Sequence, residues 1–317
     1  MKRTNLLLIG VLAMGTAFTS CKKKGCTDPT ATNYSSEAEK DDESCQYAPA
    51  ATTKDLTLNI SGLEDLGANY KYETWIIVNG SPVSIGTFDV NAAGTMSTTT
   101  FTGSISDVDA AAMFVLSIEP FPDTDPTPSD VKILGGAFSG NSATLSVSHP
   151  AALGDDLSAA AGDYIIAAPT TTVTSDDLSG VWFFNPGATT PELTLPTLPA
   201  GWEYEGWAVI GGTPVSTGKF SDPAMADGDA SFSGTDNAGP AYPGEDFIVN
   251  APTGLTFPTD LSGQTMVISI EPVPDNSAAP FLLKPLVGMA PAAATPMTPY
   301  TLNNNAAATN PTGTATR

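Results

Sequence analysis

Carboxylates are the side chains of this sequence with the greatest capacity for chemistry. Glu119 and Glu271 occur in two similar segments, FVLSIEPFPD and MVISIEPVPD, and paired carboxylates can act as general acid and base. These glutamates hold equivalent places in two separate repeats, so they need not lie near each other. Each precedes a proline at the end of a predicted strand, where an exposed or hydrogen-bonded carboxylate is ordinary. We therefore expect a structural role for both.

Aspartates at short spacing offer the hard oxygen ligands that calcium prefers. Three loop pairs have this spacing, but none fits an EF-hand, and we expect solvated turn residues: Asp107 and Asp109, Asp123 and Asp125, Asp227 and Asp229. Asp28, Asp41 and Asp42, near the N-terminus, form another possible calcium site, although such residues more often cap turns and helix starts. Calcium is the only cofactor that we consider.

Other catalytic groups are scarce. His149 is the one histidine, it precedes Pro150 in a loop-like stretch, and no serine lies in a G-x-S-x-G motif. One histidine and three cysteines exclude His-rich metal sites and a zinc site of four cysteines. We expect no catalytic residue and a non-enzymatic protein.

The charge balance excludes nucleic acid as a partner. The 317 residues include 12 Lys and Arg against 34 Asp and Glu, a formal net charge of -22. Phosphate contacts require basic side chains. Between residues 55 and 300 there are four lysines and no arginine.

The first 20 residues predict a secretory signal. Lys2 and Arg3 precede an apolar stretch at residues 6–18, which is too short for a permanent membrane span. The sequence that ends it, Phe-Thr-Ser-Cys, resembles the lipobox of bacterial lipoproteins, which implies that Cys21 is acylated; the alternative is an ordinary cleaved signal. Residues 21–24 would be a lipidated linker. We expect a lipid anchor in the cell envelope, in the outer membrane, facing the periplasm or the surface.

Residues 25–47 predict a small disulfide module. With Cys21 acylated, Cys26 and Cys45 remain to pair outside the cytoplasm, and this segment has few large apolar side chains to stabilise it otherwise. The segment resembles a GCTDP…NY…DDGSC motif of secreted Bacteroidota proteins. Glu43 stands where that motif has glycine, which puts the turn before Cys45 in question.

Internal repetition dominates the rest of the chain. Residues 72–88 and 204–220 are identical at nine of 17 positions with an offset of 132. Residues 114–123 and 266–275 are identical at seven of ten positions with an offset of 152, so the second copy carries 20 additional residues, which we place in a long loop within residues 222–260.

These repeats predict an all-β fold of two tandem antiparallel β-sandwich domains. Apolar runs separated by Asn79-Gly80 and by Gly211-Gly212 are typical of hairpins with type I′ turns. We place the first repeat at 55–150, a connecting segment at 151–176, the second repeat at 177–289 and a disordered tail at 290–317. Trp75 and Trp207, in the middle of equivalent strands, are expected to be buried rather than to form ligand platforms.

The repeated motifs, Tyr-Glu-x-Trp, then Pro-Val-Ser-x-Gly-x-Phe, then Ser-Ile-Glu-Pro with a Pro-rich turn, resemble the anti-sigma-K factor C-terminal domain family. The resemblance covers both copies and implies an extracytoplasmic all-β module. An anti-sigma factor also needs a sigma-binding domain ahead of a membrane span, and only five residues precede the apolar segment here. The chain would thus carry the outer module, doubled, without the part that contacts a sigma factor.

Three functional hypotheses follow. The first is a non-enzymatic envelope lipoprotein that binds an envelope protein or polymer or forms a structural layer. The second is a sensory or regulatory component of an anti-sigma factor pathway. The third is an enzyme that acts on a polymer with carboxylates alone, which would require those groups to converge in one cleft.

Overall fold

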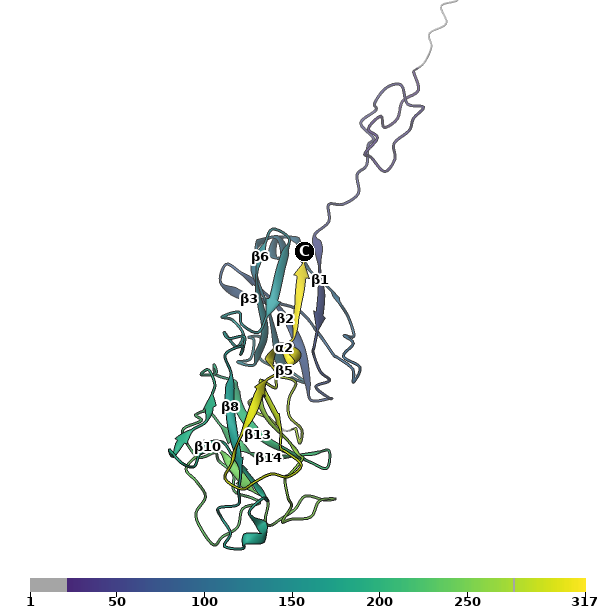
Figure 1. Cartoon of the computed structure of the whole chain (residues 1–317). Helices are drawn as coiled ribbons and strands as arrows, with labels where there is room; N and C mark the ends of the chain where they lie inside the picture. Colours follow the sequence, from purple (N-terminus) through teal and green to yellow (C-terminus); the bar gives the residue numbers. More distant parts are fainter. Residues whose placement is uncertain (1–21, 276) are drawn as a thin grey trace, which may run out of the picture. The chain divides into compact units, whose positions relative to one another are not determined.

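The computed structural model describes residues 22–275 and 277–317 (Figure 1). The signal segment and Cys21 lie outside the described residues, so acylation of Cys21 stays a prediction. The chain divides into two compact units, residues 1–52 and residues 53–317.

Among the described residues, no helix has the length and apolar character needed to cross a bilayer.

The first unit is a small loop module closed by one disulfide. Cys26 and Cys45 form the disulfide expected from the sequence, and Cys26 is almost fully buried. Three aspartates accept hydrogen bonds from backbone amides two residues further along the chain, as turn-capping residues do: Asp28, Asp41 and Asp42. Glu43, which stands where the motif has glycine, adopts a φ of 65°, in the left-handed region that favours glycine.

The second unit contains two large antiparallel sheets, which confirms the predicted all-β, two-domain fold. The first sheet has the strand order β3-β2-β5-β6-β7-β19-β1-β4. Its strands are β1 (Thr53–Ser61), β2 (Tyr70–Val78), β3 (Ser81–Phe88), β4 (Thr100–Ser104), β5 (Ala111–Pro120), β6 (Lys132–Ser139), β7 (Ser142–Ser146) and β19 (Thr312–Thr316), with the short helix α1 (Ile105–Ala110) before β5.

The second sheet has the order β14-β13-β16-β17-β18-β8-β9-β15, with β12 also pairing with β8. Its strands are β8 (Ala161–Ile166), β9 (Gly180–Trp182), β12 (Leu193–Thr194), β13 (Trp202–Ile210), β14 (Thr213–Phe220), β15 (Gly244–Asp246), β16 (Thr265–Pro272), β17 (Leu286–Met289) and β18 (Pro299–Asn304). Three further short elements are the 3-10 turn η1 (Thr174–Asp176) and the paired strands β10 (Phe184–Asn185) and β11 (Thr190–Pro191).

The two hairpins that open the repeats have the turns that their sequences predict. Asn79 and Gly80 have φ values of 51° and 83°, and Gly211 and Gly212 have values of 58° and 88°. Two successive positive φ angles define the type I′ turn, whose twist suits a β-hairpin. The long loop expected within residues 222–260 contains one short strand, β15.

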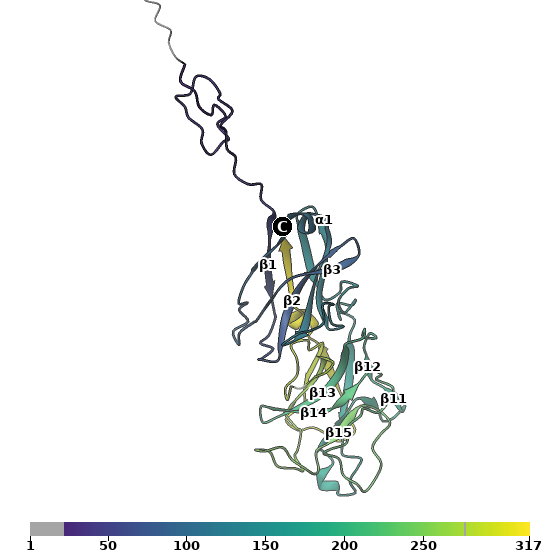
Figure 2. The same ribbon diagram turned by 180° about the vertical axis from the view of Figure 1, so that it is seen from behind.

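Each sheet is completed by a strand that follows the other repeat in the chain. β8 follows β7 in sequence but pairs with β18 and β9 in the second sheet; β19 follows β18 but pairs with β7 and β1 in the first. The two exchanged strands, β8 and β19, pair in the same register. Leu145 of β7 faces Gly313 of β19, and Leu302 of the equivalent strand β18 faces Gly162 of β8. In Figures 1 and 2 the yellow strand that ends at the C-terminus lies beside the purple β1, and the teal β8 lies with the green strands of the second sheet.

This exchange corrects the prediction of a disordered tail at 290–317. The segment contains β18, the helical turn α2 (Ala306–Thr309) and β19. Ala306 and Ala315 are buried, and the Arg317 guanidinium donates to the backbone oxygens of Val108 and Ala111 at 2.7 Å each. Small residues such as alanine and glycine suit a strand held between two close neighbours, so a composition typical of disorder was misleading here.

One hydrophobic core connects the two repeats. A single cluster of buried apolar side chains includes residues of both sheets, such as Tyr72 and Phe114 from the first and Tyr204 and Ile268 from the second. With the exchanged strands, this shared core makes residues 53–317 one compact unit. The unit is therefore expected to unfold cooperatively.

Candidate functional site

A buried chain of hydrogen bonds occurs at the same place in both repeats. In the first, the Trp75 indole donates to Ser117 Oγ at 2.8 Å, and Ser117 donates to Glu119. In the second, Trp207 donates to Ser269 Oγ at 2.8 Å, and Ser269 donates to Glu271. We call each set a Trp–Ser–Glu network. Trp75 and Trp207 are each 2% exposed, which confirms their predicted burial.

The alternation of a β-strand places these networks on the face of the sheet away from the main core. Tyr72 and Ile76 of β2 point into the core cluster, whereas Glu73 and Trp75 point to the opposite face. Trp75 faces Val115 of β5, and Trp207 faces Val267 of β16 in the same register. Each tryptophan thus helps to bury a small polar layer on the outer face of its sheet.

The glutamates of the networks hold the loops that follow their strands. Glu119 accepts a hydrogen bond from the amide of Ser129 at 2.8 Å, and Glu271 accepts one from the amide of Phe281 at 2.9 Å. Both carboxylates are at least 98% buried. The expectation of hydrogen-bonded structural carboxylates therefore agrees with the geometry, although the sequence did not indicate burial this deep.

Sequence reasoning missed the carboxylates that lie beside them. Glu73 and Glu205, on the neighbouring strands β2 and β13, point to the same outer faces and accept hydrogen bonds from Ser84 and Ser216. The signal was present, because Glu73 and Glu205 are identical in the two repeats and stand two residues before the tryptophans. Glu119 and Glu271 lie in separate sheets, as their places in separate repeats suggested, and each has a glutamate on the neighbouring strand of its own repeat.

In the second repeat the acidic side chains converge more closely. Glu205, Glu271 and Asp275 each place a carboxylate oxygen within 4.8 Å of the others, and we call this trio the acidic cluster. Burial raises the pKa of Glu205 and of Glu271 to about 7. Lys219 lies at its edge, with Nζ 3.0 Å from Asp275 and 3.3 Å from Glu203.

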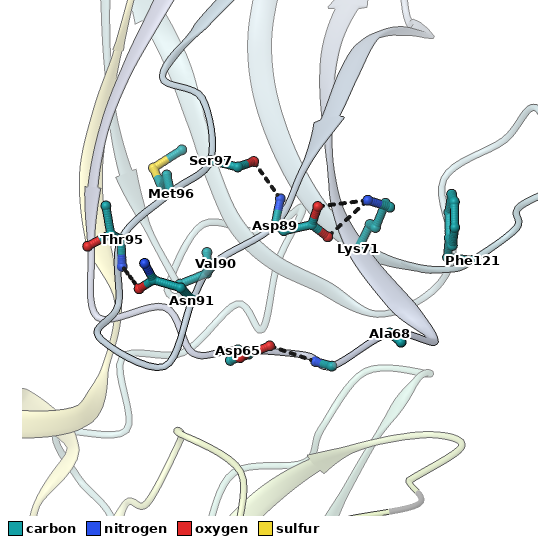
Figure 3. A pocket seen from close by; sticks show the side chains of 11 residues that line it. Asp65, Ala68, Lys71, Asp89, Val90, Asn91, Thr95, Met96, Ser97 and Phe121 are labelled. Carbon is teal, nitrogen blue, oxygen red and sulfur yellow. Dashed lines mark hydrogen bonds and ion pairs between the residues drawn. The ribbon is translucent and has the colours of Figure 1, made fainter.

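An open cavity of about 610 Å³ lies on the surface of the first repeat (Figure 3). Lys71 Nζ contacts both oxygens of Asp89, at 2.8 and 3.0 Å, and lies 4.6 Å from the centre of the Phe121 ring. The Phe121 side chain is 53% exposed, and Asn91 lines the far side of the cavity. An exposed ring beside hydrogen-bonding groups is a surface that a partner can contact.

His149 is held by a backbone hydrogen bond and by packing against a strand. Its Nδ1 accepts a hydrogen bond from the amide of Ala151 at 3.1 Å, and burial lowers its pKa. The ring packs against Gly135, where a Cβ atom would lie 2.6 Å from Nδ1. This position gives the histidine a packing role.

The loop aspartates mostly serve turns. Asp107 bonds to Ser104 at the start of α1, and Asp125 caps the turn to Thr127. Asp227 differs, since it is largely buried and accepts from the amide of Gly244 at 2.8 Å, and burial raises its pKa to about 7. The possible calcium site at Asp28, Asp41 and Asp42 stays untested.

Comparison with known families gives one match. The family described as anti-sigma-K factor rskA, C-terminal, matches residues 30–131, which are 102 of the 317 residues. The matched range includes β1 to β5 and the first Trp–Ser–Glu network and ends before the second repeat. The similarity of the second repeat to this family therefore rests only on its sequence identity to the first repeat.

No curated protein and no solved structure matches the chain.

Proposed function

We propose that this protein is a non-enzymatic lipoprotein of the cell envelope whose anti-sigma-K-factor-like β repeats bind a partner or form a structural layer. The observation that carries the proposal is the family match over residues 30–131. The signal-like segment, the lipobox-like Cys21 and the disulfide between Cys26 and Cys45 support an extracytoplasmic location.

The placement of the carboxylates supports a non-enzymatic role. A hydrolase that uses two carboxylates must bring both to a substrate. Here Glu119, Glu271 and Glu205 are at least 97% buried, and each accepts a hydrogen bond from a serine of its own repeat. This burial argues against the third hypothesis, a carboxylate enzyme that acts on a polymer.

The cavity of the first repeat is the surface that we assign to partner binding. Replacing Phe121 with a photo-crosslinking amino acid in cells should give a discrete adduct with an envelope protein or polymer. Met225 is a matched control, because it is 63% exposed and lies in the second repeat. Adducts of equal yield at both positions, or none at Phe121, would contradict this assignment.

The family match also favours a second candidate, a regulatory component of an anti-sigma factor pathway. The same experiment separates the two. An adduct with a membrane-bound anti-sigma factor would favour regulation, whereas an adduct with an envelope polymer or an unrelated envelope protein would favour the first proposal.

A further inference from the structure

The acidic cluster of the second repeat contains a buried oxygen that no protein group satisfies. Glu205 is 3% exposed, and its Oε1 accepts a hydrogen bond from Ser216. Its Oε2 is buried and has no hydrogen-bond partner. A buried acceptor without a partner is unfavourable, and a bound ion is one physical explanation for such an atom.

The nearby lysine does not satisfy that oxygen. Lys219 Nζ is within salt-bridge distance of Asp275 and Glu203, at 3.0 and 3.3 Å, at the outer edge of the cluster. The Asp275 side chain is 5% exposed, and that of Lys219 is 33% exposed. The single ammonium group of Lys219 is thus shared by Asp275 and Glu203, and Glu205 Oε2 remains without a partner.

We propose that Glu205, Glu271 and Asp275 bind one hard divalent cation of the calcium class. Carboxylate oxygens are the ligands that calcium prefers, and three of them lie within 4.8 Å of one another here. Glu205 contributes one carboxylate oxygen to this group, and its unpartnered Oε2 is available as a ligand. Hydrogen bonds from Ser269 to Glu271 and from Ser216 to Glu205 orient the carboxylates in advance.

The cation would enter past Lys219. Lys219 lines a surface cavity of about 260 Å³ and also contacts Asp275 of the acidic cluster, whose side chain is much less exposed than that of the lysine. Its flexible side chain can swing outward when a cation binds. Lys219 is thus a competitor for the site, and removing its charge should strengthen cation binding.

The first repeat supplies a matched control. The register places Thr87 opposite Glu73 where Lys219 stands opposite Glu205. The equivalent residues of the first repeat are Glu73, Glu119 and Asp123. Within the described residues, their carboxylates do not form a group within 4.8 Å as those of the second repeat do. Glu73→Gln therefore changes the same kind of buried residue without touching the proposed site.

The test is terbium luminescence of the chain after removal of metals, excited through tryptophan, with calcium as the competitor. Trp207 is joined to Glu271 through Ser269, so a bound ion would lie close enough to be sensitised. We expect one site whose signal calcium displaces. Glu205→Gln should weaken binding by about tenfold or more, and Glu73→Gln should leave it unchanged.

Lys219→Met gives a readout that does not depend on how Glu205→Gln folds. We expect it to tighten calcium binding by about tenfold or more, because a positive charge beside the cation is removed. A signal that persists in Glu205→Gln would place the ion elsewhere, for example at Asp28, and would overturn the proposal. So would an absence of binding in the unmodified chain, or calcium affinity that Lys219→Met leaves unchanged.

Discussion

Replacing Trp75 with alanine removes a side chain that is 2% exposed and that donates its indole proton to Ser117. Large-to-small changes of buried tryptophan cost about 3–5 kcal/mol. That is a large share of the roughly 5–15 kcal/mol that stabilises a typical protein. The loss includes both the packing on the outer face of the first sheet and the hydrogen bond to Ser117.

The same variant also tests whether the two repeats unfold together. The chain has four tryptophans, and those that remain are Trp182, Trp202 and Trp207, all in the second repeat. Their fluorescence in Trp75→Ala therefore reports unfolding of the repeat that was not changed. Because the core is shared and the strands are exchanged, we expect the unfolding midpoint reported by these tryptophans to fall together with that of the first repeat, in which Trp75 was replaced.

Urea unfolding followed by fluorescence and by far-ultraviolet circular dichroism is the assay. With a slope of about 3 kcal/mol/M or less, a loss of 3–5 kcal/mol lowers the midpoint by roughly 1 M or more. Phe121→Ala is the control and should shift it little, since that side chain is 53% exposed. An unchanged fluorescence midpoint in Trp75→Ala, with a separate earlier transition by circular dichroism, would refute the single cooperative unit.

Three further predictions concern other parts of the chain. Deleting residues 311–317 should lower the thermal midpoint and promote oligomers, measured by size-exclusion chromatography, because the edges of β7 and β1 lose their shared partner; a monomer of unchanged midpoint would contradict this. Burial raises the pKa of Glu205 and of Glu271 from 4.5 to about 7, so the folded state binds extra protons and stability should fall as pH rises from about 5 to 8. Across that pH range the urea midpoint should decline less steeply in Glu205→Gln than in the unmodified chain. An identical dependence on pH would count against a raised pKa of Glu205. Non-reducing peptide mapping should find Cys26 joined to Cys45, a closure over 19 residues worth about 3 kcal/mol; free thiols at both would exclude the module.

Much of the fold could be predicted because local signals agreed with the global structure. The dipeptides Asn79-Gly80 and Gly211-Gly212 predict the type I′ hairpins. The sequence identity between the two repeats predicts two sheets of the same topology. The strand exchange could not be predicted, because β8 and β19 are short and each pairs with at least one strand far away in sequence, β18 and β1 respectively. β19 is also rich in threonine, glycine and alanine, a composition that resembles a tail.

The candidate site was only partly predictable for a related reason. Glu119 and Glu271 stand out through the repeated Ser-Ile-Glu-Pro motif, but their partners Glu73 and Glu205 come from neighbouring strands. Strand register decides which carboxylates meet, and register depends on the whole sheet. The convergence of Asp275 on the second pair also depends on the loop that follows β16, which the sequence does not specify.

Anchoring at Cys21 is the point on which an envelope function most depends. Fatty-acid labelling of the unmodified chain and of Cys21→Ala in cells, followed by fractionation of membranes, tests it directly. We expect label and membrane association in the unmodified chain and the loss of both in Cys21→Ala. Label that persists in the variant, or an unmodified chain that takes up no label, would contradict it.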